Sequence, residues 1–318
     1  MSAADVYDIV VLGGGIVGIS TAWHLQLDQP DSRILVLEKE QQLAFHQTGH
    51  NSGVIHSGIY YTPGSLKAKF CKAGLTRTIE FCETHHIPYE QCGKLLVATD
   101  EMERERLVAL RERAGENQIE VEWLDGRALE EAEPNVTGLS ALLVRATGIV
   151  DYRQISERMG QLFQGLGGEI RLGSKVTGLN ENDDAIEVKT ATGESVHTRY
   201  LVSCAGLMAD RVAQMLGIDI GFETVPYRGE YYRLPDAKNS IVKHLIYPVP
   251  DPDLPFLGVH LTRMIDGSVT VGPNAVQGWK REGYGALNVS AKDVLSMFGF
   301  PGFWKVTGRH FATGIAET

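Results

Sequence analysis

Glycines and one acidic residue near the amino end have the types and spacing needed to bind a dinucleotide. The apolar run Ile9–Leu12 precedes Gly13-x-Gly15-x-x-Gly18, an apolar helical pattern and the segment Arg33–Glu38. Glycines in such a strand, turn and helix permit a sharp turn, close approach to a pyrophosphate and tight packing of helix on strand. The free N–H groups of the helix point at the phosphates, and a carboxylate accepts hydrogen bonds from a ribose diol. We therefore predict a nucleotide site at Gly13, Gly15, Gly18 and Glu38.

Composition excludes several other classes of function. The chain has 318 residues and a net charge of -10, which argues against the clustered basic face of a nucleic-acid-binding protein. No apolar run reaches the length of a membrane span, and no secretory signal precedes the first strand, so we expect a soluble, cytoplasmic protein. The four cysteines form no C-x-x-C pair and predict reduced thiols, with no metal site. A chain of this length favours two domains.

A polar, glycine-rich stretch, Lys39–Tyr61, follows the acidic residue. Such a stretch is either a long surface loop or backbone wrapped closely around a ligand. Its position directly after Glu38 favours ligand wrapping.

The rest of the chain predicts two groups of elements. Helices are expected at 65–85, 101–118, 151–166 and 207–216, and strands at 94–98, 169–172, 175–179, 185–190, 195–199 and 200–206. Because 200–216 repeats the order of strand, glycine turn and helix, the chain returns to the nucleotide sheet and the first domain is discontinuous.

Residues 221–275 predict a separate antiparallel sheet. Its expected strands cover 225–234, 244–250, 257–265 and 268–271, and Asp266-Gly267 forms the hairpin turn of the last two. We expect an α/β fold: a Rossmann-like nucleotide-binding domain at 1–85 and 145–220, and a substrate domain at 86–144 and 221–318.

Several longer motifs resemble a known family. The loop Thr48-Gly-His-Asn-Ser-Gly-Val-Ile-His-Ser-Gly-Ile-Tyr-Tyr61, the return strand Ser203–Gly206, the stretch Tyr227–Leu234 and the motif Tyr247-Pro-Val-Pro250 are similar to the D-amino acid oxidase, glycine oxidase and glycerol-3-phosphate dehydrogenase superfamily of FAD enzymes. Within it, the chain most resembles the L-2-hydroxyglutarate oxidase (dehydrogenase) group, from residue 7 to about residue 316.

The resemblance implies FAD, bound covalently or non-covalently, as the cofactor. The cofactor-binding residues that it implies are Gly13, Gly15, Gly18, Glu38, Lys39, Thr48, Ser52, Gly53, Val176, Ala205 and Gly206. The reaction implied is oxidation of L-2-hydroxyglutarate to 2-oxoglutarate, with electrons passed to a quinone or to oxygen. Peripheral contact with the inner face of the cell membrane would accompany a quinone acceptor.

The chain departs from the family pattern at its end. Members of the superfamily finish with a glycine-rich strand and a helix near the flavin, whereas this sequence stops at Thr318, within an expected helical segment. We therefore expect a truncated C-terminal part and a reduced ability to bind FAD or turn over substrate.

Oxidation of a 2-hydroxy acid needs a base for the hydroxyl proton and cations for the carboxylates. His56, in the glycine-rich loop, and His260, in the substrate sheet, are the candidate bases, although a single histidine is more often structural. Arg228, Arg233 and Arg263 are candidate carboxylate ligands. By the resemblance, Tyr247 matches a position that binds the substrate carboxylate; a buried core tyrosine is the alternative.

Strand alternation separates two of these candidates. His260, Thr262 and Met264 share one strand face, while Leu261, Arg263 and Ile265 share the other. His260 and Arg263 therefore cannot face one cavity unless a bulge intervenes, and we favour His260. Two other functions stay open: an FAD-dependent oxidase of an amino acid or N-methyl amino acid, and a flavin-binding fragment without catalysis.

Overall fold

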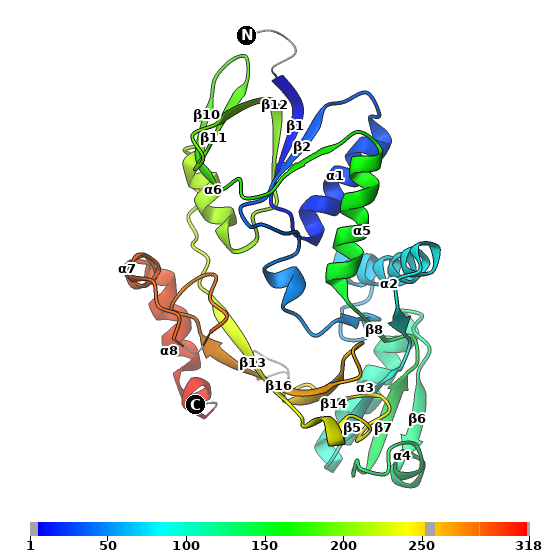
Figure 1. Ribbon diagram of the computed structural model, residues 1–318. Coiled ribbons are helices and arrows are strands. Elements are labelled where there is room, and N and C mark those ends of the chain that lie inside the picture. Colours follow the sequence, from blue (N-terminus) through cyan, green and yellow to red (C-terminus); the bar gives the residue numbers. More distant parts are fainter. Residues whose placement is uncertain (1–5, 252–257, 286, 317–318) are drawn as a thin grey trace. The chain divides into compact units, whose positions relative to one another are not determined.

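The chain folds into two compact units, each built from separated segments (Figure 1). The structure is a computed structural model that describes residues 6–251, 258–285 and 287–316. Unit 1 comprises residues 1–51, 152–226 and 277–311, and unit 2 comprises 52–151, 227–276 and 312–318. These units divide the chain at other residues than the expected domains do: 52–85 lies in unit 2 and 277–311 in unit 1.

Unit 1 is organised around a sheet of six strands in the order β10-β11-β12-β1-β2-β9. Its strands are β1 (Val6–Leu12), β2 (Ile34–Leu37), β9 (Glu169–Arg171), β10 (Val176–Glu181), β11 (Ile186–Thr190) and β12 (Ser195–Ser203). β12, β1, β2 and β9 are parallel, whereas β10, β11 and β12 are antiparallel. The parallel pairing of β1 with β12 confirms that the chain returns to the first sheet. β12 is a single strand where two were expected.

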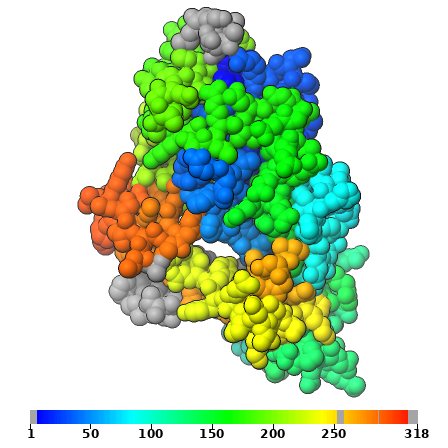
Figure 2. Space-filling model, in the orientation of Figure 1, coloured from blue at the N-terminus to red at the C-terminus, as the bar shows by residue number. Residues whose placement is uncertain are grey.

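Side chains of β1 alternate between the two faces of this sheet. Ile9 and Val11 pack with α1 (Ile16–Asp28) and α5 (Tyr152–Gly165), whereas Val10 and Leu12 pack in the cluster that includes Val212 of α6 (Ala209–Met215). Both faces of a parallel sheet are covered in this way, which explains why β1 and β2 are continuous apolar runs. Figure 2 shows the first segment of unit 1, in blue, packed directly against its green segment.

The remaining elements of unit 1 are short or lie after residue 276. They are the 3₁₀ turns η2 (Gln47–Gly49) and η3 (Gly206–Met208), and the helices α7 (Ala291–Gly299) and α8 (Pro301–Ala316), the last of which extends past the end of unit 1. Sequence patterns did not predict α7.

Unit 2 contains a sheet of seven strands in the order β13-β16-β15-β14-β5-β7-β6. These strands are β5 (Lys94–Ala98), β6 (Glu122–Asp125), β7 (Ser140–Val144), β13 (Tyr227–Arg233), β14 (Leu245–Pro248), β15 (His260–Arg263) and β16 (Val269–Gln277). The sheet predicted for 221–275 is thus not separate, because β14 pairs in parallel with β5. The hairpin at Asp266-Gly267 joins β15 and β16, as predicted; Leu257, its expected start, lies outside the described residues.

Helices cover both faces of this sheet. Leu96, Leu142 and Tyr247 pack with α3 (Glu101–Glu116), while Leu95 and Ile246 pack with α4 (Gly126–Ala132). Unit 2 also contains α2 (Leu66–His85), η4 (Asp236–Lys238) and a small sheet of β3 (Val54–Ile55), β8 (Gly148–Val150) and β4 (Tyr89–Glu90).

Three chemical features of the described residues bear on function. All four cysteines are free thiols. Within residues 6–251, 258–285 and 287–316, no helix is both long enough and apolar enough to cross a membrane. The same residues contain no group of three or more His, Cys, Asp or Glu side chains placed to hold a metal ion.

Candidate functional site

The glycine turn of unit 1 has the geometry that its spacing predicts. Gly13 has a φ of +109°, and a Cβ there would lie 2.4 Å from the carbonyl oxygen of Cys204. A Cβ on Gly18 would lie 1.9 Å from the carbonyl oxygen of Gly13, so only glycine allows α1 to approach the strand. At Gly15, by contrast, the nearest atom to a Cβ is Thr48 Oγ1 at 3.3 Å. Gly13 and Gly18 therefore shape the turn, and Gly15 leaves its backbone open to a ligand.

A cavity of about 740 Å³ opens at this turn, a volume in the range of cofactor sites. The N-terminus of α1 lines it. The N-cap residue of this helix is Gly15, which has no side chain to cover the first turn. The expected cofactor residues that line this cavity are Gly13, Gly15, Glu38, Lys39, Thr48, Val176, Ala205 and Gly206. The structure thus brings together residues from three separate parts of the sequence.

Glu38 is buried in the wall of the cavity and is held by backbone amides. Gly14 N–H donates to its Oε2 at 2.6 Å and Glu40 N–H donates to its Oε1 at 2.8 Å. Each carboxylate oxygen accepts about two hydrogen bonds, so both oxygens keep a lone pair for a ribose hydroxyl. The amides fix the orientation of the carboxylate before any ligand arrives.

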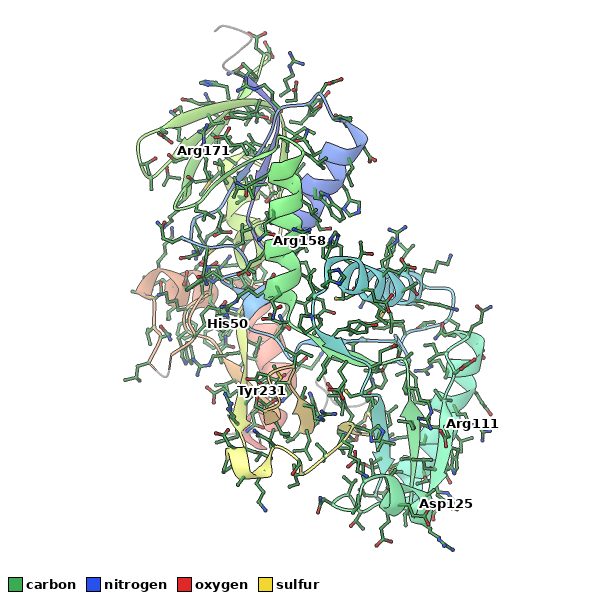
Figure 3. All side chains as sticks on the ribbon, turned by 45° about the vertical axis from the view of Figure 1, so that its right-hand side comes forward. His50, Arg111, Asp125, Arg158, Arg171 and Tyr231 are labelled. Carbon is green, nitrogen blue, oxygen red and sulfur yellow. The ribbon has the colours of Figure 1, made fainter. Side chains whose placement is uncertain are left out.

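Charged and aromatic side chains border the same cavity. Lys39 forms an ion pair with Glu282, and Thr48 Oγ1 accepts a hydrogen bond of 3.1 Å from Ile16 N–H at the start of α1. Phe45 and His46 supply aromatic lining, and behind them His50, labelled in Figure 3, stacks on Tyr284 with ring centroids 3.8 Å apart. An open glycine, a helix N-terminus and a buried acid on one cavity fit the adenosine diphosphate part of FAD.

Three expected cofactor residues do not line the cavity. Gly18 acts through packing, as described above. Ser52 and Gly53 belong to unit 2, where Gly53 O accepts a 2.8 Å hydrogen bond from Val150 N–H. A direct role for Ser52 and Gly53 in cofactor binding stays a prediction.

Unit 2 carries a cluster of titratable side chains on one face of its large sheet. His260 is buried and stacks on Tyr247, with ring centroids 3.9 Å apart. Its Nδ1 lies 3.0 Å from the carbonyl oxygen of Gly258, which can only accept, so Nδ1 carries the proton. The lone pair of the neutral ring is then on Nε2. Burial lowers the pKa of His260 below its ordinary value, with a contribution from the charge of Lys94.

Lys94, at the start of β5, is the residue of this cluster that the sequence did not single out. Its side chain is fully buried, with Nζ 4.5 Å from the centre of the Tyr60 ring and 5.1 Å from that of Tyr247. Lysine is almost never fully buried without a partner. The signal in the sequence was a lysine beginning the buried strand Lys94–Ala98. Tyr60, which also went unnoticed, lies with its Oη 3.4 Å from Lys94 Nζ.

His56 joins this cluster from the glycine-rich loop. Part of His56 is accessible to solvent, but protein atoms surround most of its ring. This burial, together with the charges of Lys94 and His260, lowers the pKa of His56 to about 4. The two expected bases, His56 and His260, therefore share one electrostatic environment. The loop is held to α2, because the Cys71 thiol donates to the carbonyl oxygen of His56 at 3.3 Å.

The expected arginines lie on β13 and β15 of unit 2. Arg263 Nη1 donates to Glu90 at 2.8 Å and to the carbonyl oxygen of Lys243 at 2.6 Å. The β15–β16 register has no bulge, so Arg263 faces away from His260, as strand alternation predicts. Arg228 lies on β13 and pairs with Glu230, and Arg233 is largely exposed. A carboxylate-binding role for Arg228 or Arg263 stays a prediction.

Comparisons with known proteins agree with this geometry. The profile of the family described as FAD dependent oxidoreductase matches residues 8–311. L-2-hydroxyglutarate dehydrogenase of Escherichia coli strain K12 is 54% identical over 312 residues, which cover 98% of this chain and 74% of that protein. The mitochondrial L-2-hydroxyglutarate dehydrogenase of Homo sapiens is 43% identical over 328 residues, 99% of this chain and 71% of that protein.

A solved structure also resembles the chain. Dithionite-reduced L-alpha-glycerophosphate oxidase from Mycoplasma pneumoniae, with FAD bound, matches with a TM-score of 0.78 at 27% identity. The match covers 92% of this chain and 78% of that one.

Proposed function

The chain belongs to the FAD dependent oxidoreductase family, and from this premise we propose that it oxidises L-2-hydroxyglutarate to 2-oxoglutarate with FAD as its cofactor. The observation that carries the proposal is the titratable cluster of unit 2, in a chain 54% identical to an L-2-hydroxyglutarate dehydrogenase. That cluster offers a proton acceptor and several hydrogen-bond donors, which a dicarboxylic alcohol requires.

The reaction removes two electrons and two hydrogens from the alcohol, one hydrogen from the hydroxyl oxygen and one from the α-carbon. The hydroxyl proton goes to a base, the α-hydrogen leaves as hydride, and a C=O bond replaces the C–O single bond. FAD, when bound, supplies the hydride acceptor. The cavity of unit 1 would hold its adenosine diphosphate part, with the pyrophosphate at Gly15 and the ribose at Glu38.

We assign the proton transfer to His260, with His56 as the second candidate. The lone pair of His260 lies on Nε2, and its lowered pKa keeps the ring neutral at the pH of the cytoplasm. An imidazole that is already protonated could not accept the hydroxyl proton. Tyr231, labelled in Figure 3 on β13, has its ring centroid 6.4 Å from that of His260 and encloses the base from another strand.

Recognition of the two substrate carboxylates requires donors and positive charge. Burial raises the pKa of Tyr60 and of Tyr247, so both hydroxyls stay protonated and can donate. We propose Arg228 as a carboxylate ligand in preference to Arg263, because Arg263 faces away from His260 on β15. Arg228 would then exchange its ion pair with Glu230 for the substrate carboxylate.

Two further properties belong to the proposed function, the electron acceptor of the reduced flavin and the cellular location of the protein. We propose that electrons pass on to a quinone or to oxygen and that the protein works in the cytoplasm. A quinone acceptor would require peripheral contact with the inner face of the cell membrane. Reoxidation of the reduced protein by a soluble quinone analogue, compared with air, distinguishes the two acceptors.

Anaerobic flavin reduction tests the proposed reaction. Protein reconstituted with FAD should lose its visible flavin absorbance when L-2-hydroxyglutarate is added, and an equal amount of 2-oxoglutarate should form. D-2-hydroxyglutarate serves as the matched control for the shape of the substrate. Faster reduction by glycine or sarcosine would instead favour an amino acid oxidase, and bound FAD that no substrate reduces would favour a binding function alone.

A further inference from the structure

We propose that Lys94 is a positioning residue for the histidine bases: its buried ammonium fixes the Tyr247–His260 stack and presents a positive charge to His56 and His260. The inference rests on the proposed function, in which His260 accepts the hydroxyl proton of the substrate. Lys94 itself is enclosed by aromatic rings and is not assigned a contact with the substrate.

The first support for this role is that Lys94 is a charged side chain buried among apolar residues. Its side chain lies on the sheet face where Leu96, Leu142 and Tyr247 form a buried core cluster. Among the described residues, no carboxylate forms an ion pair with its Nζ, which lies against two tyrosine rings and 3.4 Å from the Tyr60 hydroxyl. An unpaired buried ammonium costs stability, so a function is needed to explain it.

Strand order connects Lys94 to His260. β5, β14 and β15 are neighbours in the sheet, with Lys94 opposite Leu245 and Leu261 opposite Ile246. Because side chains alternate along a strand, Tyr247 lies on the same face as Leu245, and so does His260. Lys94, Tyr247 and His260 therefore follow one another across three strands. Cation–π and stacking contacts join them.

The loop that carries His56 meets the same ammonium. Tyr60 lies against Lys94 and is four residues from His56, whose carbonyl is held by Cys71. The titratable groups around Lys94 are His56 and Tyr60 from the loop, Cys71 from α2, Tyr247 from β14, His260 from β15 and Tyr231 from β13. The charge of one residue thus acts on both candidate bases.

The charge acts in the pH range where the histidines titrate. Burial lowers the pKa of Lys94 to about 7, so the side chain is protonated in acid, where a histidine would otherwise gain its proton. The ammonium opposes that second positive charge and lowers the pKa of both His56 and His260. A neutral residue of similar length would fill the space but would remove this repulsion.

The variant Lys94→Met removes the ammonium and keeps a side chain of similar length. It therefore distinguishes an effect of the charge from an effect of packing. Histidine ring NMR titrations of the protein without substrate should show higher pKa values for His56 and His260 than in the parent protein. The signals are assigned with His56→Gln and His260→Gln. In the holoenzyme, the acid limb of kcat/KM should move to higher pH, and the plateau value of kcat should fall roughly tenfold because the base is less well held.

Lys67→Met is the matched control, since it removes the same charge from an exposed position on α2. It should leave both histidine titrations and the pH profile unchanged, whereas Lys94→Arg should restore low histidine pKa values. Unchanged histidine pKa values in a folded Lys94→Met protein would overturn the proposal. This outcome is distinct from failure of the proposed function, in which L-2-hydroxyglutarate would not reduce the flavin of the parent protein, whatever the histidines do.

Discussion

The nucleotide turn of unit 1 and the titratable cluster of unit 2 are built in opposite ways. The turn depends on backbone geometry over a few consecutive residues, Gly13 to Gly18, and on one acid that two backbone amides hold. The cluster depends on side chains from the loop and from three or more strands. Two of these residues, Lys94 and His260, are more than 160 residues apart in the sequence. The nucleotide turn is therefore encoded by neighbouring residues of the sequence. The titratable cluster is formed only when the fold brings distant strands together.

The largest effect is expected at the turn, from Gly18→Ala. The new Cβ would lie 1.9 Å from the carbonyl oxygen of Gly13, so α1 must move away from the strand. We expect the protein to lose bound flavin and about 3 kcal/mol of unfolding free energy, the upper end of the usual cost of overpacking. Absorbance per mole of purified protein and thermal unfolding measure the two effects.

Gly15→Ala is the control for that variant. Its Cβ meets only Thr48 Oγ1, at 3.3 Å, and the φ of Gly15 is -75°, which any residue adopts. Stability should change by less than about 1 kcal/mol, while FAD affinity falls. Equal destabilisation by the two alanines would contradict the division of roles between the glycines.

In unit 2 the largest effect is expected from His260→Gln. Loss of a general base typically lowers kcat by about 10²- to 10⁴-fold, without an effect on a cofactor bound elsewhere. Flavin content should therefore stay at the parent level while the rate of flavin reduction collapses. His85→Gln, at the end of α2, changes a histidine outside the cluster and should retain the parent rate. A modest loss in His260→Gln would transfer the role of the base to His56.

The cluster also predicts the pH dependence of activity. Both histidines have a pKa below the ordinary value of 6.5, His56 at about 4, so they stay neutral as the pH falls through 6.5. The midpoint of the acid limb of kcat/KM should lie below pH 6.5. The unfolded chain binds protons at these residues more readily than the folded one, so stability should decrease as the pH falls below 6.5. A midpoint at 6.5 or above would mean that neither histidine is the base.

A smaller effect is expected from Glu38→Gln at the nucleotide turn. Glutamine keeps one oxygen but turns an NH₂ group toward one of the amides that Glu38 accepts from. We expect FAD affinity to fall roughly tenfold, the equivalent of about 1.4 kcal/mol. Fluorescence titration with FAD measures this loss, and Glu181→Gln, exposed at the end of β10, is the control.

The smallest effect is expected from Arg263→Met, which tests the two faces of β15. Its ion pair with Glu90 is partly exposed, so its loss should cost no more than about 1 kcal/mol of stability. The fall in kcat should be much smaller than that of His260→Gln. A comparable fall would show that the two residues act on one substrate, against the observed alternation.

The sequence was sufficient for the nucleotide turn and the central strands of unit 1 because their signals are contiguous. The glycine spacing, the apolar runs of β1 and β2 and the return strand near Ser203 each predict a local structure, and parallel pairing joins the return strand to the first sheet, as predicted. The sequence was insufficient for the sheet of unit 2. β6 and β7 are short strands that the sequence patterns did not predict, and no local pattern indicates that β14 will pair with β5.

The same limit explains which residues of the site were found. His56, Tyr247 and His260 were recognised by their types and motifs, but the role of Lys94 depends on a neighbour about 150 residues away in sequence, Tyr247. Alternation along β15 was enough to separate His260 from Arg263, since strand periodicity is local. Only the order of strands could place Lys94 beside them.

That order has a consequence for synthesis on the ribosome. β1 finds its neighbour β12 only after residue 195 has been made, and β5 finds β14 only after residue 245. Until then, the growing polypeptide carries apolar strands with open edges, the features that promote misassembly between nascent chains. Both halves of the molecule must therefore wait for late segments, and chaperones that shield strand edges should raise the yield of native protein.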